Sequence, residues 1–340
     1  MESPQGANSN YTYLTNLSPK DKPWDKHKAE AEKVKRLYKG TMLDCYADRI
    51  DNCGGLLGFK WVLDDKTGEL KLKLNACRFC HCRHCPICQW RKSLMWIARF
   101  LGAMPVIVRD YPSARYVFLT LTVKNCEIGE LRETLAQMNK AWDRMSKRRA
   151  FPAIGFARST EVTKSADGMA HPHFHALLMV EPGYFAGKNY LTQADWTELW
   201  RSCLKVDYTP VVNIKAVKNR RRRVQSQKQV NLPLDGSDTS ETILAAIERT
   251  SSGIVETFKY AVKPSDLIGT ESEADRNWLV ELTSQLHKTR SVALGGVFKN
   301  YLSEKEPENL IGNDEELTNK VSDICFGWKE SLARYIDIKW

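Results

Sequence analysis

The segment that most constrains this chain is a predicted β-hairpin that carries closely spaced histidines. Residues 155–163 and 171–180 are rich in apolar and β-branched side chains, and Ala166-Asp167-Gly168 supplies turn-forming residues between them. Side chains at alternate positions of a strand lie on the same face of a sheet. One face of the second strand is therefore predicted to carry three imidazoles: His171, His173 and His175.

The pairing register decides whether a carboxylate joins these imidazoles. Residues directly opposite each other in an antiparallel pair share a face. A connecting loop with an odd number of residues therefore places Glu161 opposite His173 or His175, whereas an even loop places Glu161 on the other face. Two imidazoles and one carboxylate would form an open site for a metal ion.

A single histidine in a strand is most often an ordinary surface or core residue. Three at strand spacing are harder to explain in that way, because a buried imidazole needs a partner. We expect His173 and His175 to bind a metal ion with Glu161 as the third ligand. We expect His171 to flank the site or to contact substrate.

The composition narrows the class of protein. The formal net charge is +10, which favours a polyanionic partner, most simply nucleic acid. No apolar run approaches the roughly 18 residues of a membrane span, and the start, MESPQGANSN, lacks the apolar core of a signal peptide. We therefore expect a cytoplasmic protein.

Cysteine is concentrated in one short stretch. Of ten cysteines, five lie between residues 77 and 88, which indicates metal ligation in a reducing compartment rather than disulfides. Cys85 and Cys88 have the spacing of a zinc knuckle. The sequence leaves their partners open among several candidates: Cys45, Cys53, Cys77, Cys80, Cys82, His81 and His84. We favour a structural zinc bound by Cys53, Cys80, Cys85 and Cys88; the alternative is a set of packed, reduced thiols.

Basic side chains gather at two further places. Residues 218–240 form a polar insert with Arg220, Arg221, Arg222 and Arg223, which we interpret as a DNA-phosphate contact, although such runs are often solvated loops. A helix predicted over 90–104 begins with the basic pair Arg91 and Lys92, for which we also expect contact with phosphate.

Periodicity predicts most of the remaining elements. Residues 1–22 read as a disordered tail, and a helix follows from Pro23. The other predicted strands are 55–63, 70–74, 115–123 and 211–217, and the other predicted helices are 131–149, 195–204 and 239–263.

The last of these helices carries reactive side chains on one face. Glu256, Tyr260 and Lys263 share that face by their i, i+4 and i+3 spacing. A tyrosine hydroxyl can attack a phosphodiester, a nearby lysine can stabilise the developing charge, and a glutamate can later activate water. From spacing alone, an ordinary Glu and Tyr on a surface helix is the favoured interpretation.

Taken together and in order, the motifs resemble a known superfamily. The chain is similar to the HUH endonucleases, and more narrowly to rolling-circle plasmid replication initiators (Rep) of the one-tyrosine type. The motifs that carry the resemblance are Phe118-Leu-Thr-Leu-Thr122, His173-Phe174-His175, Tyr260-Ala-Val-Lys263, the segment Cys80 to Lys92, Asp21-Lys-Pro-Trp24 and Gly295-Gly-Val-Phe-Lys299.

The resemblance implies a fold and a domain organisation. The fold would be α+β, with a central antiparallel sheet of about five strands flanked by helices and an N-terminal zinc-binding segment. The expected divisions are a disordered tail (1–22), an N-terminal helix with the Cys-rich region (23–105), an HUH nuclease domain with the basic loop (106–302) and a C-terminal extension (303–340).

The resemblance also implies an activity. His173, His175 and Glu161 would bind Mg²⁺ or Mn²⁺, Tyr260 would nick DNA, and Glu256 would direct water at termination. The partners would be the double-strand origin, a single-stranded hairpin extruded from it, and a host helicase and DNA polymerase. Two alternatives remain: an HUH transposase or relaxase, and a non-catalytic zinc-dependent nucleic-acid-binding regulator.

Overall fold

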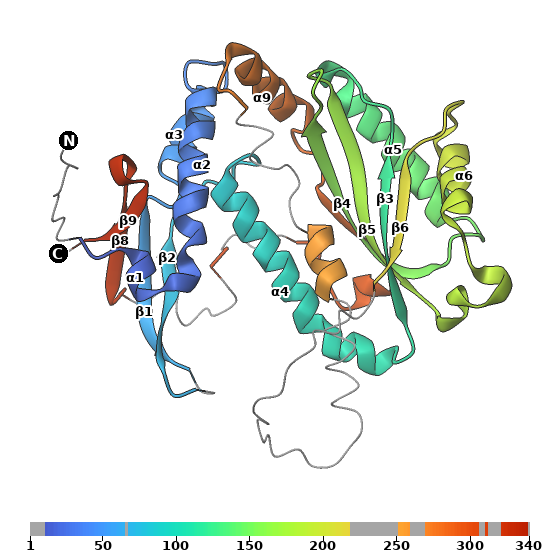
Figure 1. The fold of residues 1–340 in the computed structure, drawn as a ribbon, viewed down its shortest axis with the longest axis horizontal. Helices are drawn as coiled ribbons and strands as arrows, with labels where there is room; N and C mark the ends of the chain where they lie inside the picture. Colours follow the sequence, from blue (N-terminus) through green and yellow to red (C-terminus); the bar gives the residue numbers. More distant parts are fainter. Residues whose placement is uncertain are drawn as a thin grey trace, which may run out of the picture. The chain divides into compact units, whose positions relative to one another are not determined.

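The computed structural model describes residues 11–64, 67–217, 251–258, 269–305, 310–311 and 321–338 (Figure 1). The chain divides into two compact units. Unit 1 comprises Met1–Lys92, Leu267–Val280 and Pro307–Trp340, and unit 2 comprises Ser93–Asp266 and Glu281–Glu306. Each unit contains one antiparallel sheet, so the fold is α+β as the sequence predicts. The domain limits at residues 105 and 302 stay a prediction.

The sheet of unit 1 joins the two ends of the chain. Its strand order is β2-β1-β8-β9, with β1 (Leu56–Leu63), β2 (Leu70–Cys77), β8 (Ile324–Lys329) and β9 (Arg334–Asp337). Strands β8 and β9 belong to the segment predicted as a C-terminal extension, where the sequence alone assigned no role to Trp328 and Tyr335. Tyr335 is fully buried, and its hydroxyl donates to the Gly54 carbonyl oxygen at 2.5 Å.

The remaining elements of unit 1 are mainly helical. They are α1 (Leu14–Leu17), η1 (Pro19–Asp21), α2 (Pro23–Tyr38), α3 (Asp44–Asp51) and η6 (Glu330–Leu332). The predicted disordered tail therefore differs from the structure in its second half. Leu14 is fully buried and Tyr13 forms a β-bridge with Ile336, so a long-range contact orders a segment whose local composition is that of a tail.

The sheet of unit 2 has five strands in the order β6-β3-β5-β4-β7. They are β3 (Arg115–Thr122), β4 (Ala153–Lys164), β5 (Ala170–Val180), β6 (Val212–Ala216) and β7 (Val292–Gly296). All four strand pairings are antiparallel. The sequence predicted the first four of these strands within a few residues and did not predict β7 as a strand.

Helices cover both faces of this sheet (Figure 1). One face packs against α4 (Pro86–Asp110), whose residues from Ser93 onward belong to unit 2, and against a helical segment, residues 251–258. The other face packs against α5 (Leu131–Ser146) and α6 (Gln193–Leu204), where Trp142 and Trp200 contact the Phe174 ring.

The glycine pair of β7 allows close packing at the edge of the sheet. A Cβ atom on Gly295 would overlap the Phe156 ring, and one on Gly296 would overlap the Ile154 carbonyl. Gly296 also has φ +56°, a conformation that favours glycine. The pair thus leads the chain directly from β7 into the buried Phe298.

The remaining elements of unit 2 are η2 (Ile128–Glu130), η3 (Pro182–Phe185), η4 (Gly187–Asn189) and η5 (Val297–Asn300). The helix α9 (Glu273–Gln285) belongs to unit 1 as far as Val280 and to unit 2 from Glu281 onward. Within the described part of the chain, no helix combines the length and the apolarity that crossing a bilayer requires.

Candidate active site and metal centres

The β4–β5 register brings a carboxylate to the histidines. Residues 165–169 connect the two strands, an odd number, and Glu161 pairs directly with His173. His175 pairs with Ser159 in the same register. Of the two registers that the sequence left open, the chain adopts the one in which the acid and the imidazoles share a face.

The three side chains converge on one carboxylate oxygen. Glu161 Oε2 lies 3.1 Å from His173 Nε2 and 2.9 Å from His175 Nε2. One ligand atom from each residue lies within 4.8 Å of the other two. Glu161 is only 5% exposed and His173 9%, so the group is built into the sheet. Nitrogen and oxygen atoms this close to one another could hold a divalent cation.

Neighbouring groups orient both imidazole rings. His173 Nδ1 lies 3.2 Å from the His171 carbonyl oxygen, which can only accept a hydrogen bond, so Nδ1 carries the proton. His175 Nδ1 lies 3.1 Å from Thr120 Oγ1, and the Phe118 ring stacks on His175 with 5.4 Å between centroids. These contacts turn both Nε2 atoms towards Glu161 Oε2. The residues therefore fit a divalent metal ion.

The electrostatics of Glu161 support the same interpretation. Burial raises the pKa of its carboxyl group, but hydrogen bonds from His173 and His175 together outweigh burial and lower the pKa to about 2. Glu161 is therefore ionised at neutral pH, as a metal ligand must be.

His171 lies beside this group rather than within it. Its ring centroid is 5.3 Å from that of His173, and the ring is half-buried. Burial, followed by the nearby His173, lowers its pKa. Its position agrees with a flanking role, and a substrate contact stays a prediction.

The helical segment 251–258 packs beside the Glu161–His173–His175 group. Ser159, the register partner of His175, donates from Oγ to the Thr257 carbonyl at 2.5 Å. Gly253 lets the segment approach the sheet, because a Cβ atom there would lie 2.9 Å from Leu177 Cδ1. The Phe258 ring stacks on Trp96 in the core, with 5.6 Å between centroids.

This segment contains one of the three predicted catalytic side chains. Glu256 lies on it and is exposed. Tyr260 and Lys263 follow it in sequence and lie outside the described residues.

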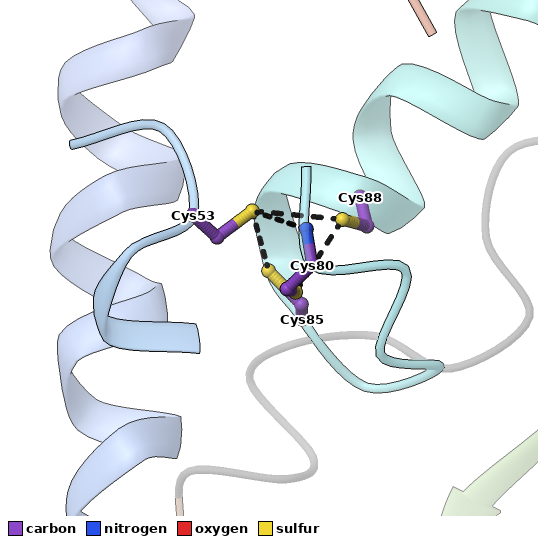
Figure 2. A group of neighbouring side chains, drawn as sticks. All are labelled: Cys53, Cys80, Cys85 and Cys88. Carbon is purple, nitrogen blue, oxygen red and sulfur yellow. Dashed lines mark hydrogen bonds between the residues drawn. The ribbon is translucent and has the colours of Figure 1, made fainter. Parts of the chain in front are cut away.

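A second group of ligand atoms lies in unit 1 (Figure 2). The Sγ atoms of Cys53, Cys80, Cys85 and Cys88 lie within 4.8 Å of one another, and all four residues are buried. Three of the Sγ–Sγ distances, Cys53–Cys88, Cys80–Cys88 and Cys53–Cys85, are 3.6 Å.

The spacing of these thiols suits zinc. A tetrahedral Zn²⁺ with Zn–S bonds of about 2.3 Å separates its sulfurs by about 3.8 Å. The backbone N–H groups of Cys80 and Cys82 donate to sulfur at 3.4 Å, which stabilises thiolates. Hydrogen bonds from Cys53 and the neighbouring thiols lower the pKa of Cys80. The buried group could hold a metal ion such as zinc, with the four cysteines that the sequence favours.

The other candidate ligands lie outside this group. The Cys77 thiol faces the Arg78 carbonyl at 3.7 Å, and the Cys82 thiol faces the Cys80 carbonyl at 3.8 Å. His84 is fully buried, and burial, followed by the charge of Arg83, lowers its pKa to about 3.

The predicted DNA contact of Arg91 needs a correction. Its guanidinium donates to the Leu310 carbonyl at 2.7 and 3.0 Å and to the Ile311 carbonyl at 3.1 Å, and it lies over the Trp24 ring. These hydrogen bonds hold it inside unit 1, and burial lowers its pKa. Lys92 is half-buried. Arg220, Arg221, Arg222 and Arg223 lie outside the described residues, and their predicted role stays a prediction.

Sequence reasoning missed three residues that contact the Glu161–His173–His175 group or hold the segment next to it. Phe118 and Thr120 contact the His175 ring, and Ser159 holds the segment 251–258. The alternation of Phe118-Leu-Thr-Leu-Thr122 gave a usable signal, because Phe118 and Thr120 share one face. The alternation alone does not say which residue these side chains contact. The β3–β5 register shows this, because it places Thr120 opposite His175.

Comparison with known proteins identifies the family. The family model described as "Replication protein" matches residues 71–336. A "Protein rep" from Lentilactobacillus hilgardii is 30% identical over 326 residues, 93% of this chain and 95% of the relative. A "Protein rep" from Lactiplantibacillus plantarum is 33% identical over 300 residues, 87% of this chain and 86% of the relative.

A third relative also aligns with most of the chain. A "Protein rep" from Bacillus amyloliquefaciens is 32% identical over 303 residues, 85% of this chain and 84% of the relative. No solved structure matches the chain. The match of the family model to most of the chain, together with relatives that align over nearly their full length, means that this chain belongs to the replication protein (Rep) family of plasmid replication initiators.

Proposed function

We propose that the chain initiates rolling-circle replication by nicking one strand at the double-strand origin of a plasmid. The observation that carries the proposal is the Glu161–His173–His175 group, with the segment 251–258 held beside it by Ser159. The segment leads directly to Tyr260, so the predicted nucleophile follows a helix that is anchored next to the metal ligands.

The nicking step is a transesterification. The Tyr260 hydroxyl loses its proton to solvent and attacks the scissile phosphorus, and the bond from phosphorus to the 3′-oxygen breaks. That oxygen takes a proton and becomes the 3′-OH primer, while the 5′-phosphate stays on the tyrosine. Glu161, His173 and His175 would hold Mg²⁺ or Mn²⁺, which when bound polarises the scissile phosphate and offsets its developing charge. Lys263 would stabilise the same charge.

Termination would use a second cleavage or hydrolysis. The Glu256 carboxylate takes a proton from a water molecule, the water oxygen attacks phosphorus, and the bond to Tyr260 breaks. The phenol regains a proton and the DNA end leaves as a 5′-phosphate. Glu256 is exposed on the anchored segment, which suits a base that acts on water. A host helicase and a DNA polymerase would unwind the duplex and extend the primer between the two events.

The test uses a single-stranded oligonucleotide from the origin, with Mn²⁺, and denaturing electrophoresis of the products. The native protein should give a free 3′-OH fragment and a covalent protein–DNA adduct. Tyr260→Phe should give neither, because phenylalanine has no nucleophilic oxygen. Glu256→Ala is the matched variant: it should form the adduct and fail to release it by hydrolysis.

The same assay, together with a plasmid replication test, separates the alternative functions. A zinc-dependent binding protein without catalytic activity would shift the DNA and leave it uncut. An HUH transposase or relaxase would also form the adduct, but it would not support replication of a plasmid that carries the origin. An adduct that persists in Tyr260→Phe would assign the nucleophile to another residue.

A further inference from the structure

The loop that carries part of the cysteine group is held rigidly by the surrounding fold. We call residues 78–85 the zinc loop. Three of its backbone carbonyls accept hydrogen bonds from outside it, and two of its residues, Cys80 and Cys85, belong to the thiol group. Gly54 N donates to the Arg78 carbonyl oxygen at 2.9 Å, Arg49 Nη2 donates to that of Cys80 at 2.5 Å, and Gln89 Nε2 donates to that of Arg83 at 2.6 Å.

The side chains of the zinc loop divide into a buried and an exposed set. Cys80 and Cys82 are buried, whereas Arg78 and His81 are exposed and Phe79 is half-buried. His81 has φ +54°, a conformation that costs energy for any residue other than glycine. Strain of this kind is retained where the surrounding structure imposes it, and here it leaves the imidazole in solvent between two inward thiols.

The exposed set has the chemistry of a phosphate contact. Arg78 is a cation, His81 offers a ring N–H, and the exposed Arg49 of α3 adds a second guanidinium where it reaches the loop carbonyl of Cys80. The acidic neighbour of Arg49, Asp48, faces Lys39 at 3.6 Å. The loop therefore presents positive charge and hydrogen-bond donors on a rigid support.

We propose that the exposed side of the zinc loop binds the phosphate backbone of duplex DNA, with Arg78 and His81 as the donors. The identification of that duplex as origin DNA rests on the proposed function; the phosphate contact itself does not. A duplex fits better than a single strand, because it carries one negative charge per about 1.7 Å of helix axis and the loop offers cationic and N–H donors rather than a row of exposed aromatic rings.

The experiment measures DNA affinity against salt concentration. Full-length protein is titrated into a fluorescent duplex of mixed sequence, since phosphate contacts do not depend on sequence. The double variant Arg78→Ala, His81→Ala should bind the duplex roughly tenfold more weakly at moderate salt, and the slope of log K against log salt should fall by about one. Lys33→Ala, which removes an exposed cation of α2 in the same unit, is the control and should change the slope less.

Three readouts make the outcome decisive. The zinc content and the melting temperature of the double variant should equal those of the native protein; if either falls, Arg78→Gln alone replaces the double variant. An unchanged duplex affinity and salt slope with zinc retained overturns the proposal. A loss confined to a single strand of the same sequence overturns the assignment to duplex. The nicking activity is read separately from the phosphotyrosyl adduct, so its absence would not decide the duplex measurement.

Discussion

The two groups of metal-ligand atoms contrast in how they enclose a cation. The cysteine group in unit 1 offers four buried sulfurs, enough to complete a tetrahedral shell. The Glu161–His173–His175 group in unit 2 offers three atoms from two adjacent strands, which would leave coordination positions on a bound cation for a substrate oxygen. A closed shell stabilises a fold and an open one takes part in chemistry, so substitutions at the two groups should affect different properties.

The largest effect is expected at the closed group. Cys85→Ser should abolish zinc binding and destabilise unit 1 by up to about 10 kcal/mol, because a structural zinc site contributes its binding energy to folding. Zinc content by mass spectrometry and thermal unfolding measure this. Cys82→Ser changes a buried cysteine outside the group and is the matched control. Equal zinc loss in both variants would contradict the assignment of four ligands.

The next effect concerns the open group and should leave stability nearly unchanged. His173→Ala removes one of three ligands and should lower metal-dependent nicking by about a thousandfold, the usual scale for losing a main electrostatic contribution. Cleavage rates over a range of Mn²⁺ concentrations check this. His171→Ala alters the flanking imidazole and should retain Mn²⁺ affinity. Full activity in His173→Ala would remove the open group from the mechanism.

The acid stability of the metal-free protein should depend on Glu161. The pKa of this carboxyl group is about 2 in the fold and near 4.5 in the unfolded chain. A lowered folded pKa means that the stabilisation is present above pH 4.5 and is lost as the pH falls towards 2. The total loss should be about 3 kcal/mol. Urea unfolding across this range tests the effect, and Glu161→Gln should flatten the pH dependence between pH 4.5 and 2.

The smallest effect is expected at a residue that orients a ligand. Thr120→Val keeps the shape but removes the hydroxyl beside His175 Nδ1, and Mn²⁺ affinity should fall about 10- to 100-fold. Isothermal titration with Mn²⁺ measures the change. Thr122→Val is the control on the same strand and face, because its hydroxyl bonds the Val211 carbonyl rather than a ring. If both variants bind Mn²⁺ equally, Thr120 has no orienting role.

The sequence was sufficient to predict those features that depend on the spacing of residues within one short segment. The alternation of His171, His173 and His175 determined their common face, and the spacing of Cys85 and Cys88 indicated metal ligation. The apolar periodicity of residues 131–149 predicted α5. These patterns depend on strand and helix geometry, which each short segment carries in itself.

Contacts between residues far apart in the sequence determined the strand register, the position of Arg91 and the order of the N-terminal segment. The sequence left the β4–β5 register open, and the odd loop with its pairing partners chose the face of Glu161. Arg91 was interpreted as a surface cation, but it is half-buried and donates to carbonyls more than 200 residues away in the chain, at Leu310 and Ile311. The N-terminal segment around Leu14 read as disordered, yet Tyr13 pairs with Ile336.

By itself, the sequence determined which residues could bind a metal ion and on which side of a strand they lie, because those properties follow from residue type and a repeat of two. Only the tertiary structure decided which cysteines meet, which cation bonds distant carbonyls, and that Ser159 holds the segment 251–258 beside the histidines. Those outcomes depend on which segments, far apart in the sequence, pack against each other and bury apolar surface. A local sequence pattern does not say which distant segment will be the packing partner.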